Sequence, residues 1–253
     1  MDIDKYLNHS VLRALSILET FEGKDTVLSI ADISRIIGLH RSTVHRLVIT
    51  LESAGWLSRL PGSEKFVLGL KVLSLRENVN QPLSLVDVTR PLLKDLAKKT
   101  GETIILSMKD GMQTICVDII ESTYGLKVSA RIGQGYPLYA GATGLAVLIG
   151  MNDNEVRELL SQIKLKPFTS ATHTDPAELY QIYLKARNEG YIVSSGHVDP
   201  GVVGIGVPLF FKKADKHGSI SCVLPDSRAT KENIESIIVN IKKTLVDINK
   251  RIN

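Results

Sequence analysis

Two periodicities follow each other between residues 40 and 68, and they constrain the fold of this chain more than any other feature. The first part carries apolar residues at intervals of three and four, namely Val44, Leu47, Val48 and Leu51. This spacing places them on one face of a helix. Beyond residue 54 apolar and polar residues alternate instead, as in a strand, and residues 61–64 (PGSE) supply a turn before residues 65–68. We therefore expect a helix followed directly by a β-hairpin.

A second, shorter helix is expected just before the first, over residues 28–38. Ser29 is suited to cap its start, and Gly38 is suited to the left-handed conformation that ends many helices. Its inward side chains are Ile30, Ile33 and Ile37. Because only a short turn at residues 38–40 separates the two helices, the spacing is that of a helix-turn-helix, to which the hairpin adds a wing.

The outward face of the longer helix is short, polar and cationic, which suits a helix that lies in the major groove of DNA. Arg46 can donate two hydrogen bonds to a guanine, whereas Arg59 and Lys65 flank the hairpin turn and are expected to reach phosphates. Ile49 shares this face and either meets a thymine methyl or packs against a neighbouring helix. The residues expected to contact DNA are Arg41, Ser42, Thr43, His45, Arg46, Arg59 and Lys65. A charged helix face alone is most often only a solvated surface, so the expectation rests on the conjunction of helix, turn, basic helix and wing.

The net charge of +4 does not by itself argue for a nucleic-acid partner. Residues 1–70 carry eight basic and eight acidic side chains, so this part of the chain is neutral overall. The positive charge is local, since residues 40–59 hold three Arg, two His and one Glu. One such face makes few phosphate contacts, and we therefore expect a dimer that binds a palindromic site on double-stranded DNA.

Length and composition exclude several classes of protein. Roughly 170 residues remain beyond the winged region, enough for one further α/β domain. Cys116 and Cys222 lie far apart without metal-ligand spacing, so we expect buried thiols of a cytosolic protein and neither a metal nor a cofactor. The acidic N-terminus is unlike a signal peptide, and no apolar run is long enough to span a membrane.

Residues 8–22 predict a first helix with the core side chains Val11, Leu15, Leu18 and Phe21.

A linker is expected between the winged region and the second domain. After the wing, residues 69–77 predict a linker helix and residues 78–82 a break. A helix over residues 83–99 follows, kinked or restarted at Pro91.

The second half of the chain predicts three strands at residues 103–107, 113–119 and 125–131, followed by three helices at residues 144–149, 153–162 and 176–189. Three more strands are expected at residues 192–194, 202–208 and 219–224, and a last helix at residues 232–252. This order predicts an α+β fold with helices against one face of a sheet. We expect three parts: a winged helix-turn-helix domain at residues 1–70, a linker helix at residues 71–82, and an effector-binding and oligomerisation domain at residues 83–253.

Short motifs throughout the chain follow the pattern of one protein family. They lie at residues 10–19, 42–47, 50–51, 55–57, 66–70, 100–103, 117–118, 121–122, 144–146, 174–177, 190–191 and 201–208. In these motifs the chain resembles the IclR family of bacterial transcriptional regulators. The resemblance implies a GAF-like effector-binding domain after the winged helix-turn-helix, a first helix that helps to form a dimer, and an assembly of homodimers or homotetramers.

One candidate ligand site is the motif Gly141, Ala142, Thr143 and Gly144, which lies where a loop gives way to a helix. Small residues allow a ligand to approach the backbone, and free amides at a helix start favour an anion. Close packing of a helix on a sheet would need the same glycines, and for the motif alone that structural explanation is preferred. No Lys-Ser or Lys-Thr follows, so the motif is not a nucleotide loop.

The resemblance adds further residues to the effector site, namely Ser194, His197, Gly204 and Ser221. Several family members carry acidic residues near positions 194–197 and a cysteine at position 204, so the chemistry of this pocket differs from theirs. Alternation along residues 219–224 separates Ser221 from Cys222, which is expected in the core. The combined set of amides, hydroxyls and imidazole suits a small carboxylate bearing hydroxyls, such as a sugar acid or a breakdown product of an aromatic compound.

Two other functions are the alternatives. Four residues suggest a hydrolase, namely Ser194, Ser195, His197 and Asp199, but they are crowded into one short segment without a nucleophile-elbow motif, so an enzyme that uses this pocket is the weaker alternative. A DNA-binding protein without a ligand would not need the second domain. We therefore expect a ligand-responsive regulator in the cytoplasm, a repressor of a catabolic operon.

Overall fold

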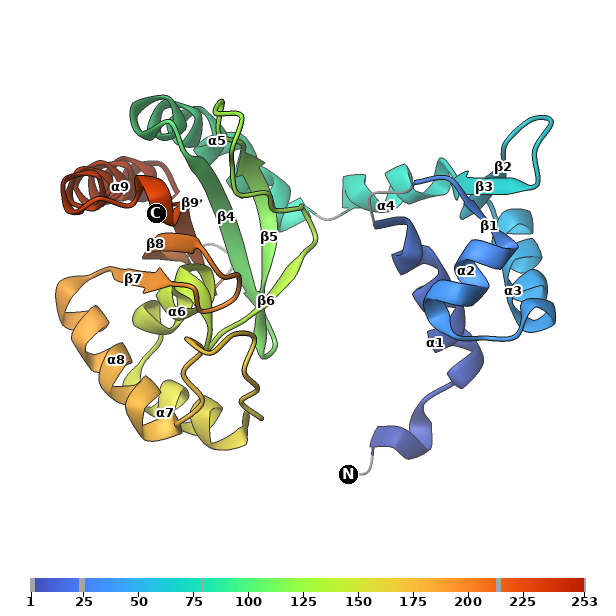
Figure 1. Cartoon of the computed structure of the whole chain (residues 1–253), viewed down its shortest axis with the longest axis horizontal. Coiled ribbons are helices and arrows are strands. Elements are labelled where there is room, and N and C mark those ends of the chain that lie inside the picture. Colours follow the sequence, from blue (N-terminus) through green and yellow to red (C-terminus); the bar gives the residue numbers. More distant parts are fainter. Residues whose placement is uncertain (1–2, 23–25, 79, 213–214, 253) are drawn as a thin grey trace. The chain divides into compact units, whose positions relative to one another are not determined.

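The computed structural model describes residues 3–22, 26–78, 80–212 and 215–252. The chain divides into two compact units, Met1–Asn80 and Gln81–Asn253, and each has its own core (Figure 1). None of the described helices is both long and apolar enough to cross a membrane.

The first unit combines helices with a small antiparallel sheet. Its elements are η1 (Ile3–Tyr6), α1 (His9–Glu19), η2 (Thr20–Glu22), β1 (Leu28–Ser29), α2 (Ile30–Ile37), α3 (Arg41–Ser53), β2 (Leu57–Arg59), β3 (Lys65–Leu68) and α4 (Lys71–Asn78). The strand order is β1-β3-β2. The helix-turn-helix of α2 and α3 with the wing of β2 and β3 confirms the fold predicted for this region.

Local sequence explains where these elements begin and end. Asn8 caps α1, and Ser29 and Asp32 form a reciprocal capping box at the start of α2. Gly38, with φ of 68°, ends α2 in the left-handed conformation. Gly62 takes a similar φ of 70° in the turn of the wing. Each of these positions was recognisable in the sequence because the signal is local.

The core of the first unit draws on α1, η2, β1, α2, α3, β2 and β3. Its buried apolar side chains are Ile17, Phe21, Leu28, Ile33, Val44, Val48, Leu51, Leu57 and Phe66. The core stripe predicted for the first helix is partly wrong, because Val11 and Leu15 are 54% and 49% exposed while Ile17 is buried. α1 is apolar on more than one face, so periodicity alone could not select the face that packs.

The second unit is built around one antiparallel sheet. Its elements are α5 (Asn80–Thr100), β4 (Thr103–Asp110), β5 (Gln113–Ile120), β6 (Gly135–Pro137), α6 (Gly141–Gly150), α7 (Asp153–Gln162), α8 (Pro176–Glu189), β7 (Ile192–Ser195), β8 (Val202–Phe211), β9 (Lys216–Pro225), η4 (Asp226–Arg228) and α9 (Lys231–Ile252). The strand order is β6-β5-β4-β9-β8-β7. Chain-distant strands β4 and β9 therefore lie at the centre.

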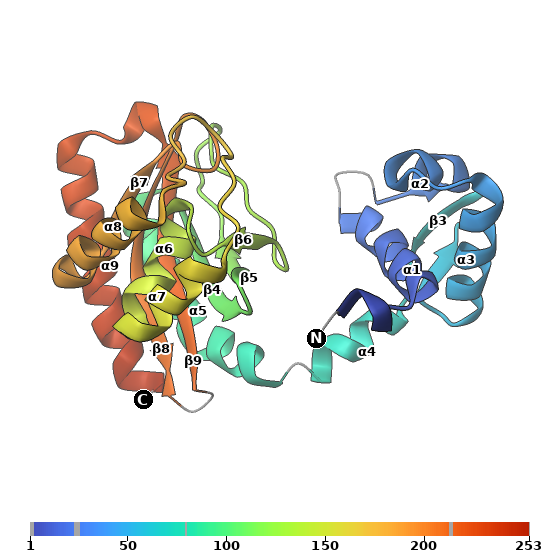
Figure 2. The same cartoon turned by 90° about the horizontal axis from the view of Figure 1, so that it is seen from below.

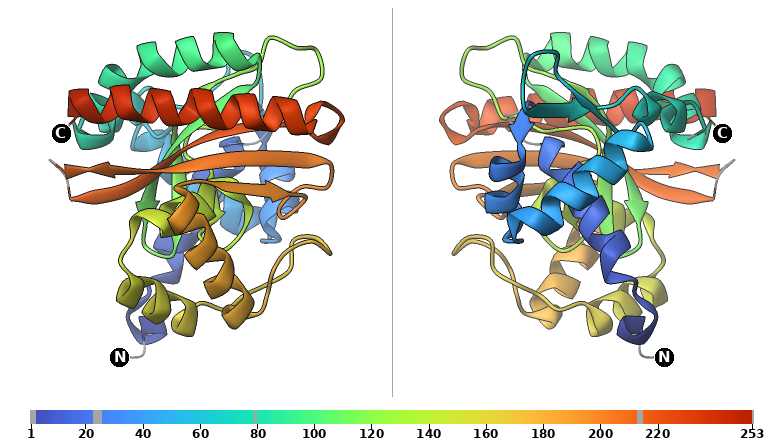
Figure 3. Two further views of the ribbon diagram at one scale, coloured as in Figure 1. Left: turned by 90° about the vertical axis from the view of Figure 1, so that its left-hand side faces the viewer. Right: turned by 90° about the vertical axis from the view of Figure 1, so that its right-hand side faces the viewer.

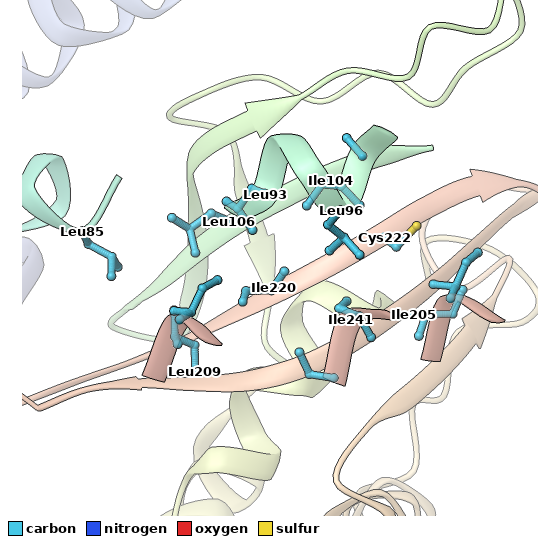
Figure 4. Close-up of a cluster of buried hydrophobic side chains, with 14 of the residues drawn as sticks. Leu85, Leu93, Leu96, Ile104, Leu106, Ile205, Leu209, Ile220, Cys222 and Ile241 are labelled. Atoms are coloured by element: carbon cyan, nitrogen blue, oxygen red, sulfur yellow. The ribbon is translucent and has the colours of Figure 1, made fainter. Parts of the chain in front are cut away.

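Helices cover both faces of this sheet, so the prediction of one covered face is wrong. α5 and α9 pack on one face, and α6 packs on the other (Figures 1 and 3). α7 and α8 lie beside one another, with α8 against α6 (Figure 2). The α5 and α9 side encloses a large apolar cluster that includes Leu96, Ile220, Cys222 and Ile241 (Figure 4).

Alternation along β9 accounts for the two covered faces. Ile220, Cys222 and Leu224 belong to the cluster under α5 and α9, as the alternation predicts. On the opposite face, the Ser219 hydroxyl donates a hydrogen bond of 2.8 Å to the Thr143 carbonyl of α6. Small and polar residues on this face gave no strong hydrophobic signal for a second covering layer.

The strand predicted at residues 125–131 is absent. No regular element lies between Ile120 and Gly135, where the chain forms an extended loop. The loop is held by side-chain and backbone bonds: the Thr103 hydroxyl donates to the Val128 carbonyl at 2.9 Å, and the Cys116 amide donates to the Gln134 carbonyl at 3.0 Å. The short strand β6 pairs with β5 in its place.

The break between helices α4 and α5 is also shorter than predicted. Of the break expected at residues 78–82, Val79 lies outside the described residues, whereas α4 reaches Asn78 and α5 starts at Asn80. Pro82 therefore falls in the first turn of α5, where no intrahelical hydrogen bond is lost. Pro91 lies inside α5, which continues to Thr100 without a restart.

Candidate functional site

α3 buries one face and exposes another that is basic. Val44 and Val48 are fully buried, while Arg41, His45 and Arg46 are exposed. The guanidinium groups of Arg41 and Arg46 form no ion pair with the described residues. Their charges are thus available to a polyanion.

The N-terminal turn of α3 is organised by His40. Its Nδ1 accepts from the Ser42 amide at 3.4 Å and lies 2.8 Å from the Ser42 hydroxyl. Thr43 is half-buried beside it. Ile49, on the exposed face, is 36% exposed. Ser42 would therefore reach DNA as part of a pair with His40.

The two wing cations differ in their surroundings. Arg59 Nη1 lies 2.8 Å from Glu64 Oε2, and Arg59 Nε lies 3.4 Å from Glu52 Oε1. Lys65 is exposed and has no ion-pair partner within the described ranges. Lys65 can approach a phosphate freely, whereas Arg59 would first have to leave its carboxylates.

The second unit contains a cavity of about 60 Å³ between the sheet, the start of α6 and two loops. It is lined by Ile105, Val128, Ser129, Ala130, Tyr136, Ala140, Gly141, Ala142, Thr143, Ser194, His197, Val198, Asp199, Val202, Gly204 and Val223. The sheet supplies the floor, the loop at residues 128–130 one wall, and residues 197–199 another. Its lining combines apolar side chains with a few polar groups, as in pockets for small ligands.

The start of α6 forms one edge of this cavity. Its N-cap residue, Ala140, makes no side-chain hydrogen bond to the first-turn amides. Amides at such a position carry partial positive charge and favour anions. Gly204 lets the helix lie close to β8, because a Cβ at this position would be 2.8 Å from the Ala142 Cβ.

Hydrogen-bonding side chains complete the lining. Burial, together with the nearby His173, lowers the pKa of His197, so its imidazole is neutral at pH 7. Burial raises the pKa of the Tyr136 phenol to about 12, so it stays protonated. Hydroxyl side chains and one carboxylate lie around them, those of Ser129, Thr143, Ser194 and Asp199. The site can therefore both donate to an anion and accept from a hydroxyl.

Most residues predicted for the effector site meet at this cavity. Those that line it are Gly141, Ala142, Thr143, Ser194, His197 and Gly204. Gly144 and Ser221 do not. A Cβ at Gly144 would lie 2.0 Å from the Pro137 carbonyl oxygen, so this glycine serves close packing. Ser221 is fully buried in the sheet, and its hydroxyl has no hydrogen-bond partner among the described residues.

Three polar lining residues were not predicted for the effector site: Ser129, Tyr136 and Asp199. Tyr136 arrives there through the pairing of β6 with β5, which opposes it to Thr114. Ser129 lies in the loop that the sequence had predicted as a strand. In the sequence, Asp199 is marked only by its closeness to Ser194, as part of the possible hydrolase site. No local pattern marks these residues.

Comparison with known proteins agrees with both units. The profile of the IclR helix-turn-helix domain matches residues 10–61, and that of the bacterial transcriptional regulator IclR C-terminal domain matches residues 78–250. The chain is 29% identical to the HTH-type transcriptional regulator KipR of Bacillus subtilis, over 97% of each chain. It is 25% identical to the transcriptional repressor IclR of Escherichia coli, over 89% of this chain and 83% of that protein.

A solved structure shows the same fold along the whole chain. An IclR homologue from Microbacterium hydrocarbonoxydans, complexed with 4-hydroxybenzoate, has a TM-score of 0.76 at 24% identity and covers 95% of this chain and 99% of its own. The two profile matches together span most of the sequence. The chain therefore belongs to the IclR family of bacterial transcriptional regulators, and it is a DNA-binding regulator rather than an enzyme.

Proposed function

We propose that this regulator represses a catabolic operon and that a small hydroxylated carboxylate controls its binding to DNA. The observation that carries the proposal is the cavity at the uncapped start of α6. A ligand carboxylate suits the helix amides, and ligand hydroxyls suit Asp199, the neutral His197 and the hydroxyl side chains. A cationic ligand would find only Asp199 as a charged partner.

Two relatives support this proposal. The Escherichia coli relative is named a repressor, and the Microbacterium hydrocarbonoxydans homologue is complexed with 4-hydroxybenzoate, itself a hydroxylated carboxylate. The lining of the present cavity includes Ser194 and Gly204. The compound that we propose is therefore one that binds to hydroxyl and amide donors on one side and faces a glycine on the other. An acid of about the size of a short sugar acid is the class we propose.

The proposed division of labour follows the two units. Residues 1–70 bind DNA, residues 71–82 link, and residues 83–253 bind effector and oligomerise. The residues proposed to contact DNA directly are Arg41, Ser42, Thr43, His45, Arg46 and Lys65. The effector shifts operator affinity only by the difference in its affinity for the two states of the protein.

A dimer is proposed from an exposed apolar groove in the first unit. The groove is lined by Asn8, Ser10, Val11, Ala14, Leu15, Leu18, Leu47, Thr50, Leu51, Trp56 and Leu75. Large exposed apolar surfaces mark interaction sites. A second copy would cover this surface and place two recognition helices on a palindromic operator in the cytoplasm. Pairs of such dimers would form the homotetramers that the family resemblance implies.

Fluorescence anisotropy with DNA from upstream of the gene tests the proposal. We expect tight, salt-sensitive binding that is lost on scrambled DNA of the same composition. Hydroxylated carboxylates are then titrated into the complex, with matched amides and amines as controls. If the protein binds neither the upstream DNA nor neighbouring promoter DNA, the proposed regulatory function is contradicted. If amines but not acids release the protein from DNA, the proposed class of effector is contradicted.

The role of Arg46 can be separated from general affinity. Arg46→Ala should cost about 1–3 kcal/mol at one base pair and relax specificity there, because a bidentate contact to a base is lost. Single-base operator variants reveal this loss. Equal losses on cognate and scrambled DNA would refute base reading by Arg46.

A further inference from the structure

Arg59 is the last residue of β2, and its guanidinium lies between two carboxylates. Nη1 is 2.8 Å from Glu64 Oε2, while Nε and Nη2 are 3.4 Å and 3.5 Å from the two oxygens of Glu52. The carbon at the centre of the guanidinium lies 4.8 Å from the centre of the Phe66 ring. Phe66 itself is fully buried. The side chain is therefore held on three sides.

These partners come from different elements. Glu52 lies in the last turn of α3, Glu64 in the turn of the wing, and Phe66 on β3 directly across from Arg59. One side chain thus connects the end of the recognition helix with both arms of the hairpin. Because residues 54–56 are the only chain connection from α3 to the wing, this contact limits how the wing can tilt against the helix.

The surroundings also argue against a direct phosphate contact. The Arg59 side chain is 35% exposed and that of Glu52 is 29% exposed, so both are partly withdrawn from solvent. To bind a phosphate, Arg59 would have to leave Glu52 and Glu64 and bring two unpaired carboxylates towards a polyanion. Both carboxylates raise the pKa of the Arg59 guanidinium, since each favours its charged form.

We propose that Arg59 is a positioning residue that clamps the wing to the end of α3, and that Lys65 makes the phosphate contact of the wing. The proposal rests on the proposed DNA-binding function and changes the role expected for Arg59 from sequence. Isolated exposed ion pairs contribute little to stability, but a network of one Arg and two Glu, with the Arg over an aromatic ring, contributes more.

The test compares Arg59→Met, Glu52→Gln and Lys65→Met in the full chain, with two measurements for each. Anisotropy across a salt series on generic duplex DNA counts phosphate contacts, because the slope changes by about 0.9 for each one. Hydrogen exchange without DNA reports the junction of α3 and the wing, through the Trp56 amide that donates to the Leu51 carbonyl at 2.9 Å. Generic duplex DNA serves because phosphate contacts do not depend on sequence.

The proposal expects a distinct result for each variant. Arg59→Met and Glu52→Gln should each speed exchange at Trp56 roughly three- to fivefold, because either change opens the clamp. Arg59→Met should weaken DNA binding without lowering the salt slope. Lys65→Met should lower the slope by about 1 and leave the exchange unchanged. The double variant Arg59→Met/Glu52→Gln should exchange no faster than Arg59→Met, because Arg59→Met already removes the contact with Glu52.

Any other combination overturns the proposal. A salt slope that falls in Arg59→Met as it does in Lys65→Met shows that Arg59 itself binds phosphate. Unchanged exchange in Arg59→Met or Glu52→Gln shows that no clamp operates. If the unsubstituted protein binds no DNA, the proposed function fails, whereas the exchange measurements still decide whether the clamp exists.

Discussion

Glu102 and Arg228 form a bidentate ion pair, with Nε–Oε1 and Nη2–Oε2 distances of 2.6 Å each. The Glu102 side chain is only 2% exposed and that of Arg228 is 26% exposed. Arg228 also donates to the Leu126 carbonyl at 3.0 Å and lies over the ring of Tyr124. The pair therefore joins the turn after α5 to the loop that leads to one wall of the cavity beside α6.

Removing Arg228 should strongly destabilise the second unit. Arg228→Met leaves the Glu102 carboxylate buried without its partner, which costs about 3 kcal/mol in the free energy of unfolding. Urea unfolding followed by circular dichroism measures this loss. As a control, Lys250→Met removes an exposed pair with Asp247 at 3.6 Å and should cost less than about 0.5 kcal/mol. Similar losses in both variants would contradict a special role for the Glu102–Arg228 pair.

Gly204 is expected to tolerate no side chain without movement of α6. In Gly204→Ala the new Cβ would lie 2.8 Å from the Ala142 Cβ, so the helix start must shift away from β8. Overpacking of this kind costs about 1–3 kcal/mol, and we expect weaker binding of the effector as well. Thermal and urea unfolding give the first number. Gly125→Ala, where an added Cβ would meet nothing within 4 Å, is the matched control and should change little.

His197 should make stability depend on pH below neutrality. Burial, and then the nearby His173, hold its folded-state pKa below the usual 6.5, although Glu178 acts in the opposite direction. As the pH falls below about 6.5, the unfolded chain binds a proton that the folded protein resists. The contribution is fully present above that pH and is lost as the pH falls towards the folded-state pKa.

Unfolding free energies at pH 7.5 and 5.5 check this expectation. The difference between the two pH values should be smaller in His197→Asn than in the unsubstituted protein. His217, whose pKa is also lowered mainly by burial, remains in both proteins and so cancels from the comparison. An equal difference in the two proteins would show that His197 does not titrate differently on unfolding.

The exposed apolar face of α1 should be needed for assembly. Leu15→Glu places a charge in the groove lined by Val11 and Leu15, which a second copy would otherwise cover. Sedimentation velocity should then show a smaller species, and affinity for a palindromic site should fall towards that for a half-site. Ile36→Glu, at a residue that is 57% exposed and outside this groove, provides the control. An unchanged sedimentation coefficient in Leu15→Glu would place the dimer interface elsewhere.

Predictions agree with the structure where the sequence signal lies within a few consecutive residues. The helix start at Ser29, the helix end at Gly38, the helix bounds 176–189 and the wing turn all agree with prediction. Each depends on a few consecutive residues, whose backbone preferences act locally. The strand expected at residues 125–131 failed because Val128 and Ala130 line the cavity from a loop, which is held by the distant Thr103 hydroxyl, while Leu126 is exposed.

Consecutive side chains are enough to predict the helix-turn-helix, its basic exposed face and the alternation of β9, because periods of 3.6 and 2 residues are local patterns. Only the folded chain shows which face of α1 is buried, how Tyr136 and Asp199 join Ser194 at one cavity, and that Glu52 and Glu64 enclose Arg59. These outcomes depend on contacts between elements that are separate along the chain, and local preference does not specify which distant partner wins.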